Sequence, residues 1–199
     1  MMKLANKTVI GLTGGIGCGK STATNFFLEK SIPIIDADKL GHKILEEIKI
    51  KNELVFSFGK IILADGEISR KKLGKLVFSD KSKLEKLNEI VHPVLIERIQ
   101  QRVNSLHNRF VIIDAALLLD WETDNLCDFI VIIKAEYETR VKRLENYKNL
   151  SREDAEARIR AQKFDTSKCD FLISNNSTKH EFYSKLEIVW KKIIDYSGG

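Results

Sequence analysis

Short, mostly apolar runs alternate along the 199-residue chain with longer stretches of mixed polar and apolar residues. Runs of four to six such residues, bounded by polar residues or glycine, are typical of parallel strands that are buried on both faces of a sheet. Five of them occur, at Thr8–Thr13, Ile32–Ile35, Phe110–Asp114, Phe129–Lys134 and Phe171–Ser174. Helical periodicity lies between the first and second runs and again between the fourth and fifth. The pattern predicts a doubly wound α/β core on a five-stranded parallel sheet with right-handed crossovers.

The first run leads into Gly-Gly-Ile-Gly-Cys-Gly-Lys-Ser at residues 14–21, and a predicted helix over Thr22–Lys30 follows. The octapeptide fits the phosphate-loop pattern G-x-x-x-x-G-K-[ST], and strand, glycine-rich turn and helix are the context that this motif needs. Backbone N–H groups of such a loop surround phosphate oxygens, and the helix N-terminus adds its positive end. Lys20 can reach the β- and γ-phosphates, and the Ser21 hydroxyl can hold Mg²⁺. The sequence therefore predicts binding of a nucleoside triphosphate rather than a chance glycine-rich turn.

A long helical segment separates the second and third runs, although a crossover between parallel strands is usually much shorter. Its spacing predicts helices over Leu40–Ile50, Lys51–Phe58, Arg70–Phe78 and Lys81–Leu106, the last with a break near His92-Pro93. These helices could simply thicken the core. Because the segment leaves the carboxyl end of a strand, where α/β folds bind ligands, we interpret residues 39–106 as an inserted acceptor-binding region. Residues 1–38 and 107–199 would then form the core of a single domain.

A pair of helices is expected between the fourth and fifth strands, over Glu136–Asn146 and Ser151–Lys163. Ser151 followed by Asp154 is a variant of the capping box. Arg140 and Arg143 share a face of the first helix, and Arg158 and Gln162 share a face of the second. Charged helices are often only solvated. Arginines after the fourth strand of a phosphate-loop core also suit a lid that closes over phosphates, and we interpret residues 136–163 as this lid.

Acidic residues follow two of the predicted strands. If the backbone stays extended after the second strand, Asp36 and Asp38 point to the same side, beside the phosphate loop. Phosphoryl transfer to a hydroxyl needs a carboxylate near the nucleophile, and we favour Asp38 for this role, whereas Asp36 could also cap the next helix. Asp114 ends the third strand in the manner of a Walker-B aspartate that contacts Mg²⁺. His92 either binds the acceptor or is buried in its helix.

Composition narrows the class of protein. The chain is 43% hydrophobic and 31% charged, as expected of a globular domain. No apolar run approaches the ~20 residues of a membrane-spanning helix, and the N-terminal residues lead directly into the first strand. We therefore expect a cytoplasmic protein without a membrane partner. The formal net charge of +5 comes from scattered lysines and suits polyanionic nucleotides, so no nucleic-acid partner is expected.

The three cysteines Cys18, Cys127 and Cys169 are far apart and lack metal-ligand spacing, which indicates reduced thiols. Cys18 lies at the N-terminus of a predicted helix, where the pKa of a thiol tends to fall. Its modification is therefore expected to inactivate the protein. No Asn-Lys-x-Asp motif occurs, which disfavours a regulatory GTPase.

The ordered motifs resemble the dephospho-coenzyme A kinase family over nearly the whole chain. Gly11–Ser21 resembles the phosphate loop of the family, and Asp36-Ala37-Asp38 its strand-two motif, in which the second aspartate is the catalytic base. The other matching segments are Phe58-Gly59, Asp65-Gly66 with Arg70 and Leu73, Val91-His92-Pro93, Asp114–Leu118, Arg143, Arg158–Gln162 and Asp170–Asn175. Single pieces occur in other nucleotide kinases, whereas the ordered set is specific.

The resemblance implies transfer of the γ-phosphoryl group of ATP to the ribose 3′-hydroxyl of dephospho-coenzyme A, the last step of coenzyme A biosynthesis. It implies catalytic roles for Asp38, Lys20 and Arg143, and Mg²⁺ binding by Ser21 and Asp114. The implied ATP site consists of Gly15, Gly17, Cys18, Gly19, Lys20, Ser21, Thr22, Arg140 and Asn175. The implied acceptor site consists of Asp36, Arg70, His92, Leu117, Arg158 and Gln162. The partners would be ATP and dephospho-coenzyme A, with the protein a monomer or a small homo-oligomer.

Four residues depart from the family pattern. Cys18 replaces a usual serine, Ala116 a usual proline, Asp120 a usual glutamate and Tyr147 a frequent second lid arginine. None of the four removes a group that the reaction requires. Two alternatives remain at this point: a kinase of another small acceptor, such as a nucleotide or a shikimate-like alcohol, and a non-catalytic nucleotide switch or nucleic-acid-binding protein.

Overall fold

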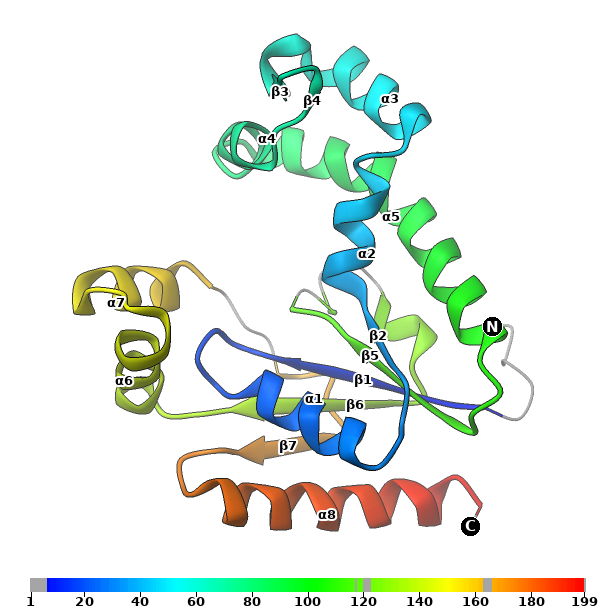
Figure 1. Ribbon diagram of the computed structural model, residues 1–199, viewed down its shortest axis with the longest axis vertical. Helices are drawn as coiled ribbons and strands as arrows, with labels where there is room; N and C mark the ends of the chain where they lie inside the picture. Colours follow the sequence, from blue (N-terminus) through cyan, green and yellow to red (C-terminus); the bar gives the residue numbers. More distant parts are fainter. Residues whose placement is uncertain (1–6, 117, 120–122, 163–165, 199) are drawn as a thin grey trace. The chain divides into compact units, whose positions relative to one another are not determined.

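The computed structural model describes residues 7–116, 118–119, 123–162 and 166–198, which group into two compact units (Figure 1). The first unit contains the chain up to Ile35 and from Leu106 onward, and the second contains Asp36–Ser105.

A five-stranded sheet organises the first unit. Its order is β2-β5-β1-β6-β7, which confirms the predicted architecture. The strands are β1 (Thr8–Gly14), β2 (Ile34–Asp36), β5 (Phe110–Asp114), β6 (Phe129–Lys134) and β7 (Phe171–Ser174). The central strand β1 runs parallel to β5 and β6 on its two sides, with Leu12 opposite Asp114 and Val131. The strands β5 and β2 lie on one side of β1, and β6 and β7 lie on the other. α/β sheets bind ligands beyond the carboxyl end of a strand at which the strand order divides in this way.

Two helices, α1 (Lys20–Glu29) and α8 (Lys179–Tyr196), pack on the sheet through one apolar cluster. Phe27 of α1 and Phe182 and Leu186 of α8 are fully buried in it, together with Ile10 and Ile133 of the sheet. The helix α8 was not predicted. It begins with a complete capping box, in which the Thr178 hydroxyl accepts from the Glu181 N–H and the Glu181 carboxylate accepts from the Thr178 N–H.

The predicted helical hairpin is present as α6 (Tyr137–Lys148) and α7 (Arg152–Ala161). The Ser151 hydroxyl caps α7 by accepting a hydrogen bond from the Asp154 N–H at 3.1 Å, as its sequence predicted. The hairpin has a small core of its own, and a residue of the phosphate loop joins it. This core contains Val141, Leu144, Ala155 and Ile159, with Ile16 and Leu150 packed against them. A short 3₁₀ helix, η2 (Thr123–Leu126), precedes β6.

The second unit is mainly helical. Its elements are α2 (Ala37–Ile44), α3 (Ile48–Phe58), the 3₁₀ helix η1 (Lys60–Ile62), β3 (Leu63–Ala64), β4 (Glu67–Ile68), α4 (Arg70–Val77) and α5 (Lys81–Ser105). The long helix α5 packs against α2, α3 and α4. The hairpin β3–β4 was not predicted, although Asp65 and Gly66 both have positive φ, at 51° and 82°, as a tight hairpin turn requires.

Two helix predictions in this unit are wrong. The expected helix Leu40–Ile50 is divided, since α2 starts earlier, at Ala37, and ends at Ile44 before α3 begins. The expected break at Pro93 does not occur, and α5 continues through it. Pro93 and Glu89, whose carbonyl loses its helical donor, are both exposed. Water can therefore satisfy that carbonyl, and packing on both halves of α5 keeps the helix together.

Among the described residues, no helix has both the length and the apolar character needed to cross a membrane.

Candidate active site

The loop between β1 and α1 has the backbone conformation of a phosphate site. Gly17 and Gly19 have φ of 77° and 97°, values that favour glycine. A Cβ on Gly17 would lie 3.0 Å from the Arg140 carbonyl oxygen, and one on Gly19 would overlap the Asn175 amide nitrogen. The Cys18 N–H donates to the Gly15 carbonyl at 3.1 Å and closes the turn. Because α1 begins at Lys20, its N-terminus lies at the end of this loop, where it favours an anion.

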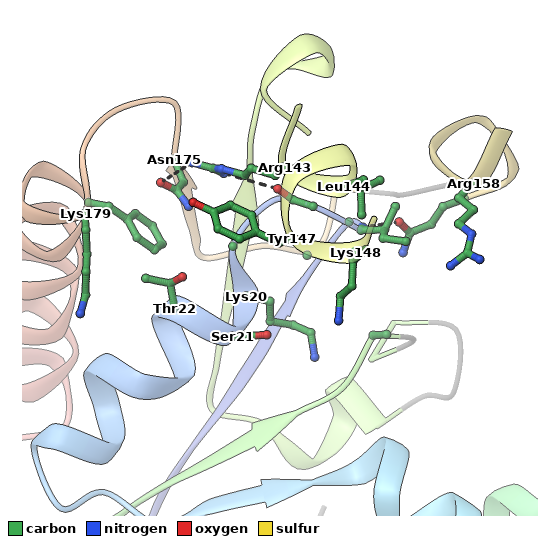
Figure 2. Close-up of a pocket in the computed structure, with 18 of the residues that line it drawn as sticks. Lys20, Ser21, Thr22, Arg143, Leu144, Tyr147, Lys148, Arg158, Asn175 and Lys179 are labelled. Atoms are coloured by element: carbon green, nitrogen blue, oxygen red, sulfur yellow. Dashed lines mark hydrogen bonds between the residues drawn. The ribbon is translucent and has the colours of Figure 1, made fainter. Parts of the chain in front are cut away.

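A pocket of about 910 Å³ lies against the phosphate loop (Figure 2). Its lining comes from the loop, the start of α1, the hairpin α6–α7 and the segment after β7. No aspartate or glutamate lines it within the described part of the chain, whereas five basic side chains do: Lys20, Arg143, Lys148, Arg158 and Lys179. A cavity surrounded by positive charge and by backbone N–H groups favours a polyanionic ligand.

The Lys20 ammonium is ion-paired with Asp114 Oδ1, at the end of the neighbouring strand β5. The other carboxylate oxygen of Asp114 accepts from the Thr24 hydroxyl at 2.9 Å. Only 20% of the Lys20 side chain and 13% of the Asp114 side chain are exposed, so solvent screens this pair little. The predicted Walker-B aspartate thus contacts the phosphate-loop lysine directly. Thr24 stands one helical turn after Lys20 and belongs to no motif that would mark it in the sequence.

Side chains from three other segments bind the backbone of the loop. Arg140 Nε donates to the Ile16 carbonyl at 2.7 Å, and Gln162 Oε1 accepts from the Ile16 N–H at 2.7 Å. Arg143 Nη1 and Asn175 Nδ2 donate to the Cys18 carbonyl at 3.2 and 2.8 Å. Arg143 Nη2 also donates to Asn175 Oδ1 at 3.3 Å, a contact drawn in Figure 2. Arg140, Arg143, Gln162 and Asn175, expected at ligands, therefore all bind the backbone of this loop.

The predicted reactivity of Cys18 is not supported by its environment. Its side chain is 1% exposed, and burial raises the pKa of the thiol because the thiolate loses its hydration. The hydrogen bond from the Lys20 N–H and the charges of Arg140, Lys20 and Arg143 lower the pKa, but they do not offset burial. The expected fall at a helix N-terminus is therefore wrong for Cys18, which acts as a small packing residue against Gly14.

The expected extended arrangement of the strand-two carboxylates is also wrong. The strand ends at Asp36, and Ala37 is already helical, so Asp38 lies in the first turn of α2. Asp36 is the N-cap of this helix. Its carboxylate accepts from the Lys39 N–H at 2.8 Å and pairs with the Lys39 ammonium at 2.9 Å. The capping alternative is therefore confirmed for Asp36, and Asp38 is a half-buried helical carboxylate.

The remaining predicted acceptor residues lie in different surroundings. Arg70 is exposed at the first position of α4, after the N-cap Ser69, and His92 is half-buried within α5. Both belong to the second unit. Arg158 is exposed on α7 and lines the phosphate-loop pocket. Leu117 and Asp120 lie outside the described residues. The acceptor roles of Arg70, His92, Leu117 and Arg158 stay predictions.

Several pocket residues carried no sequence signal. Lys148, Ser177, Lys179 and Phe182 line the cavity, yet none belongs to a motif with a fixed spacing. Lys179 and Phe182 stand on α8, which was not predicted. Tyr147, noted only as a departure, also lines the pocket, as does Ala116. Thr22 and Ser21 lie there as the phosphate-loop motif predicts (Figure 2).

Two side chains near the loop carry oxygen atoms that could hold Mg²⁺ together with a bound nucleotide. The described residues hold no cluster of three or more His, Cys, Asp or Glu side chains that could bind a metal ion. Mg²⁺ is usually held by one or two protein oxygens together with substrate phosphates and water. The exposed Ser21 hydroxyl at the start of α1 and the Asp114 carboxylate beside Lys20 are groups of this kind. Ser21 and Asp114 would hold the ion.

Comparisons with known proteins agree with this geometry. The family model described as dephospho-CoA kinase matches residues 8–181. The dephospho-CoA kinase of Fusobacterium nucleatum is 37% identical over 183 residues, which cover 90% of this chain and 95% of that protein. The crystal structure of TT1252 from Thermus thermophilus is 28% identical, with a TM-score of 0.81 over 97% of this chain and 99% of that one.

A dephospho-CoA kinase from Campylobacter jejuni is also 28% identical in sequence, with a TM-score of 0.67 over 95% of this chain and 98% of that chain. The matched region runs from β1 to the first turn of α8, and so contains the phosphate loop, the strand-two carboxylates and the hairpin. This chain belongs to the dephospho-CoA kinase family.

Proposed function

We propose that this protein transfers the γ-phosphoryl group of ATP to the ribose 3′-hydroxyl of dephospho-coenzyme A, giving coenzyme A and ADP. The observation that carries the proposal is the family match over residues 8–181, which includes a phosphate loop facing a pocket lined by five basic side chains. The loop alone is common to many nucleotide-binding proteins. The match over the second unit as well favours this acceptor over a nucleotide or a shikimate-like alcohol.

The residues of the first unit would bind and orient the donor. The N–H groups at the start of α1 and the Lys20 ammonium neutralise the phosphate oxygens, where charge develops during transfer. Arg143 lies beside the loop at Cys18 and Asn175 and adds a further positive charge. Mg²⁺, held at Ser21 and Asp114, would supply charge neutralisation between the phosphates. Thr22, Gly15, Gly17 and Gly19 shape the same cavity.

In this proposal Asp38 is the base that takes the proton of the substrate hydroxyl. It is a half-buried carboxylate in the first turn of α2, and Asp36 holds that turn by capping it. Asp36 therefore acts through the backbone that carries Asp38. Arg70 and His92, from the same unit, are proposed to bind the acceptor, together with Leu117 and Arg158.

We also propose a cytoplasmic location, no nucleic-acid partner, and a monomer or small homo-oligomer. Cys18, Cys127 and Cys169 are all free thiols, which accords with a reducing compartment. Five basic side chains line the nucleotide pocket, where they suit a polyanionic nucleotide, and the other lysines are scattered along the chain. Light scattering after gel filtration measures the oligomeric state. Salt-dependent binding of DNA or RNA at physiological ionic strength would contradict the second part.

The test is an acceptor panel. Release of ADP is measured with dephospho-coenzyme A, adenosine, AMP and shikimate, each with ATP and Mg²⁺, and the phosphorylated product is identified by mass spectrometry. We expect turnover with dephospho-coenzyme A far above that with the others. The variant Lys20→Ala serves as the control and should lose most activity while keeping its fold. Equal or faster turnover with AMP or shikimate would overturn the proposal.

A further inference from the structure

Ile16 of the phosphate loop is fixed to the hairpin α6–α7 by its side chain and by both of its peptide groups. Its side chain packs into the small core of the hairpin against Val141, Leu144, Ala155 and Ile159. Its N–H donates to Gln162 Oε1 and its carbonyl accepts from Arg140 Nε, each at 2.7 Å. The phosphate-loop motif leaves this position free, so the motif itself does not account for these contacts.

Arg140 also lies against the preceding residue. A Cβ on Gly15 would be 2.9 Å from Arg140 Nη2 and 3.3 Å from Gln162 Oε1. The pattern does not require glycine at residue 15 either. The Arg140 guanidinium and the Gln162 side-chain oxygen therefore lie close against the loop at residue 15.

These contacts determine which way the peptide groups of the loop point. In a trans peptide the carbonyl of one residue and the N–H of the next point in opposite directions. Arg140 holds the Ile16 carbonyl, and Arg143 and Asn175 hold the Cys18 carbonyl. The N–H groups of Gly17 and Gly19 are consequently turned away from the side chains that hold these carbonyls. N–H groups presented together in this way form the anion-binding surface of such a loop.

We propose that Arg140 and Gln162 are positioning residues, which hold the Ile16 peptide groups so that the phosphate loop keeps its nucleotide-binding shape. The proposal rests on the nucleotide-dependent activity proposed above and assigns both residues to the loop backbone rather than to a substrate. The competing role for Arg140 is direct contact between its guanidinium charge and the phosphates. The two roles need different properties of Arg140. Positioning needs the Nε–H donor that bonds the Ile16 carbonyl, whereas direct contact with phosphate needs the positive charge.

Two substitutions of Arg140 separate the roles. In Arg140→Gln, the Nε2 amide nitrogen stands the same number of bonds from Cα as the arginine Nε, so the donor is kept and the charge is lost. In Arg140→Met, both are lost. Calorimetry with ATP measures binding to the full chain. We expect Arg140→Met to raise the Kd by about tenfold or more, and Arg140→Gln to stay within about threefold of the unsubstituted protein.

Gln162→Leu removes the side-chain oxygen that accepts from the Ile16 N–H. It should also raise the Kd for ATP by about tenfold. Arg160→Gln is the control for lost charge, because Arg160 is exposed on α7, two residues before Gln162, and is paired with Glu156. It should leave ATP binding unchanged. In steady-state assays, Arg140→Met and Gln162→Leu should raise the KM for ATP and leave the KM for dephospho-coenzyme A unchanged.

Thermal unfolding of each variant shows whether it is folded. If Arg140→Met does not fold, the Kd of Gln162→Leu for ATP is compared with that of Arg140→Gln instead. Loss of ATP binding in Arg140→Gln as large as in Arg140→Met would overturn the proposal, and so would unchanged ATP binding in both Arg140→Met and Gln162→Leu. The calorimetry needs no acceptor. An error in the proposed acceptor would therefore appear in the acceptor panel and leave this test intact.

Discussion

Asp114→Asn tests whether the carboxylate that pairs with the phosphate-loop lysine competes with ATP for its ammonium group. Asparagine keeps the shape of the side chain, and its carbonyl oxygen can still accept from the Thr24 hydroxyl, which now lies 2.9 Å from Asp114 Oδ2. The change removes the negative charge that Lys20 contacts, because the amide nitrogen then takes the place of Oδ1. ATP brings its own negative charge to the same ammonium group, so the substitution should favour metal-free ATP.

The magnitude follows from the position of the pair. A phosphate oxygen that shares Lys20 with Asp114 would lie about 5–7 Å from the carboxylate, where two like charges repel by roughly 2–3 kcal/mol at an effective dielectric constant of about 20. Some exposure of both side chains, 20% for Lys20 and 13% for Asp114, reduces this to about 1 kcal/mol. Metal-free ATP should therefore bind about three- to tenfold more tightly to Asp114→Asn.

Activity should move in the opposite direction. Asp114 is one of the two residues proposed to hold Mg²⁺, so kcat with Mg²⁺ should fall by at least about tenfold. The free energy of unfolding should fall by only about 1–2 kcal/mol, between the values for exposed and for fully buried ion pairs. Tighter binding of the donor together with slower turnover is a combination that a general loss of structure does not produce.

The assay is calorimetry with ATP in EDTA, followed by steady-state kinetics with Mg²⁺. Thr24→Val is the matched control, because it removes the hydroxyl bonded to the same carboxylate and leaves its charge. It should change the affinity for metal-free ATP by less than about twofold. Weaker binding of metal-free ATP to Asp114→Asn would refute the reasoning, because Asp114 would then hold Lys20 in its binding position rather than compete for it.

Three further substitutions or treatments test other parts of the site. Gly19→Ala should abolish ATP binding measured by calorimetry, because residue 19 has φ of 97° and an added Cβ would overlap Asn175; native affinity would show that the loop adapts. Cys18 should resist iodoacetamide at neutral pH, followed by peptide mass spectrometry, since burial raises the pKa of its thiol; rapid labelling that ATP prevents would contradict this. Asp38→Asn should lower kcat by ~10²–10⁴-fold with little change in the KM for ATP, whereas Asp36→Asn should have a smaller effect through the helix cap. A larger loss in Asp36→Asn would reverse these assignments.

Features set by local chemistry were predictable from the sequence. The five strands have mostly apolar runs, and the phosphate loop needs its glycines at fixed positions. All five strands and the loop were therefore predicted, although β2 begins at Ile34, two residues later than expected. Ser151 was recognised as a cap because its hydroxyl bonds the backbone three residues along. The cap and the turn of the loop depend on near neighbours in sequence. The strands pair with distant segments, but burial on both faces of the sheet gives each of them an apolar run that can be recognised in the sequence.

The errors arose where neighbours distant in sequence decide the outcome. The helix α5 continues through Pro93 because three other helices pack along it. Cys18 stands at a helix N-terminus, which lowers the pKa of a thiol, but the surrounding core buries it and desolvation outweighs the helix. Nothing in the local sequence measures that burial. The cap at Asp36 is a local contact with the Lys39 N–H, and the sequence had accordingly indicated it as a possible cap.

The contacts of Ile16 show why the same limit applies to a functional site. Its partners Arg140 and Gln162 are 124 and 146 residues away in sequence, and each was noticed only for its own chemistry, one as a charge and the other as a polar group. Charge and polarity suggest binding to a ligand when the side chain's partner is not known. The structure supplies a backbone partner for each of them. Residues that shape a phosphate loop and residues that touch the phosphate can therefore be of the same types. Only substitutions that separate the hydrogen-bond donor from the charge, as Arg140→Gln does, distinguish the two roles.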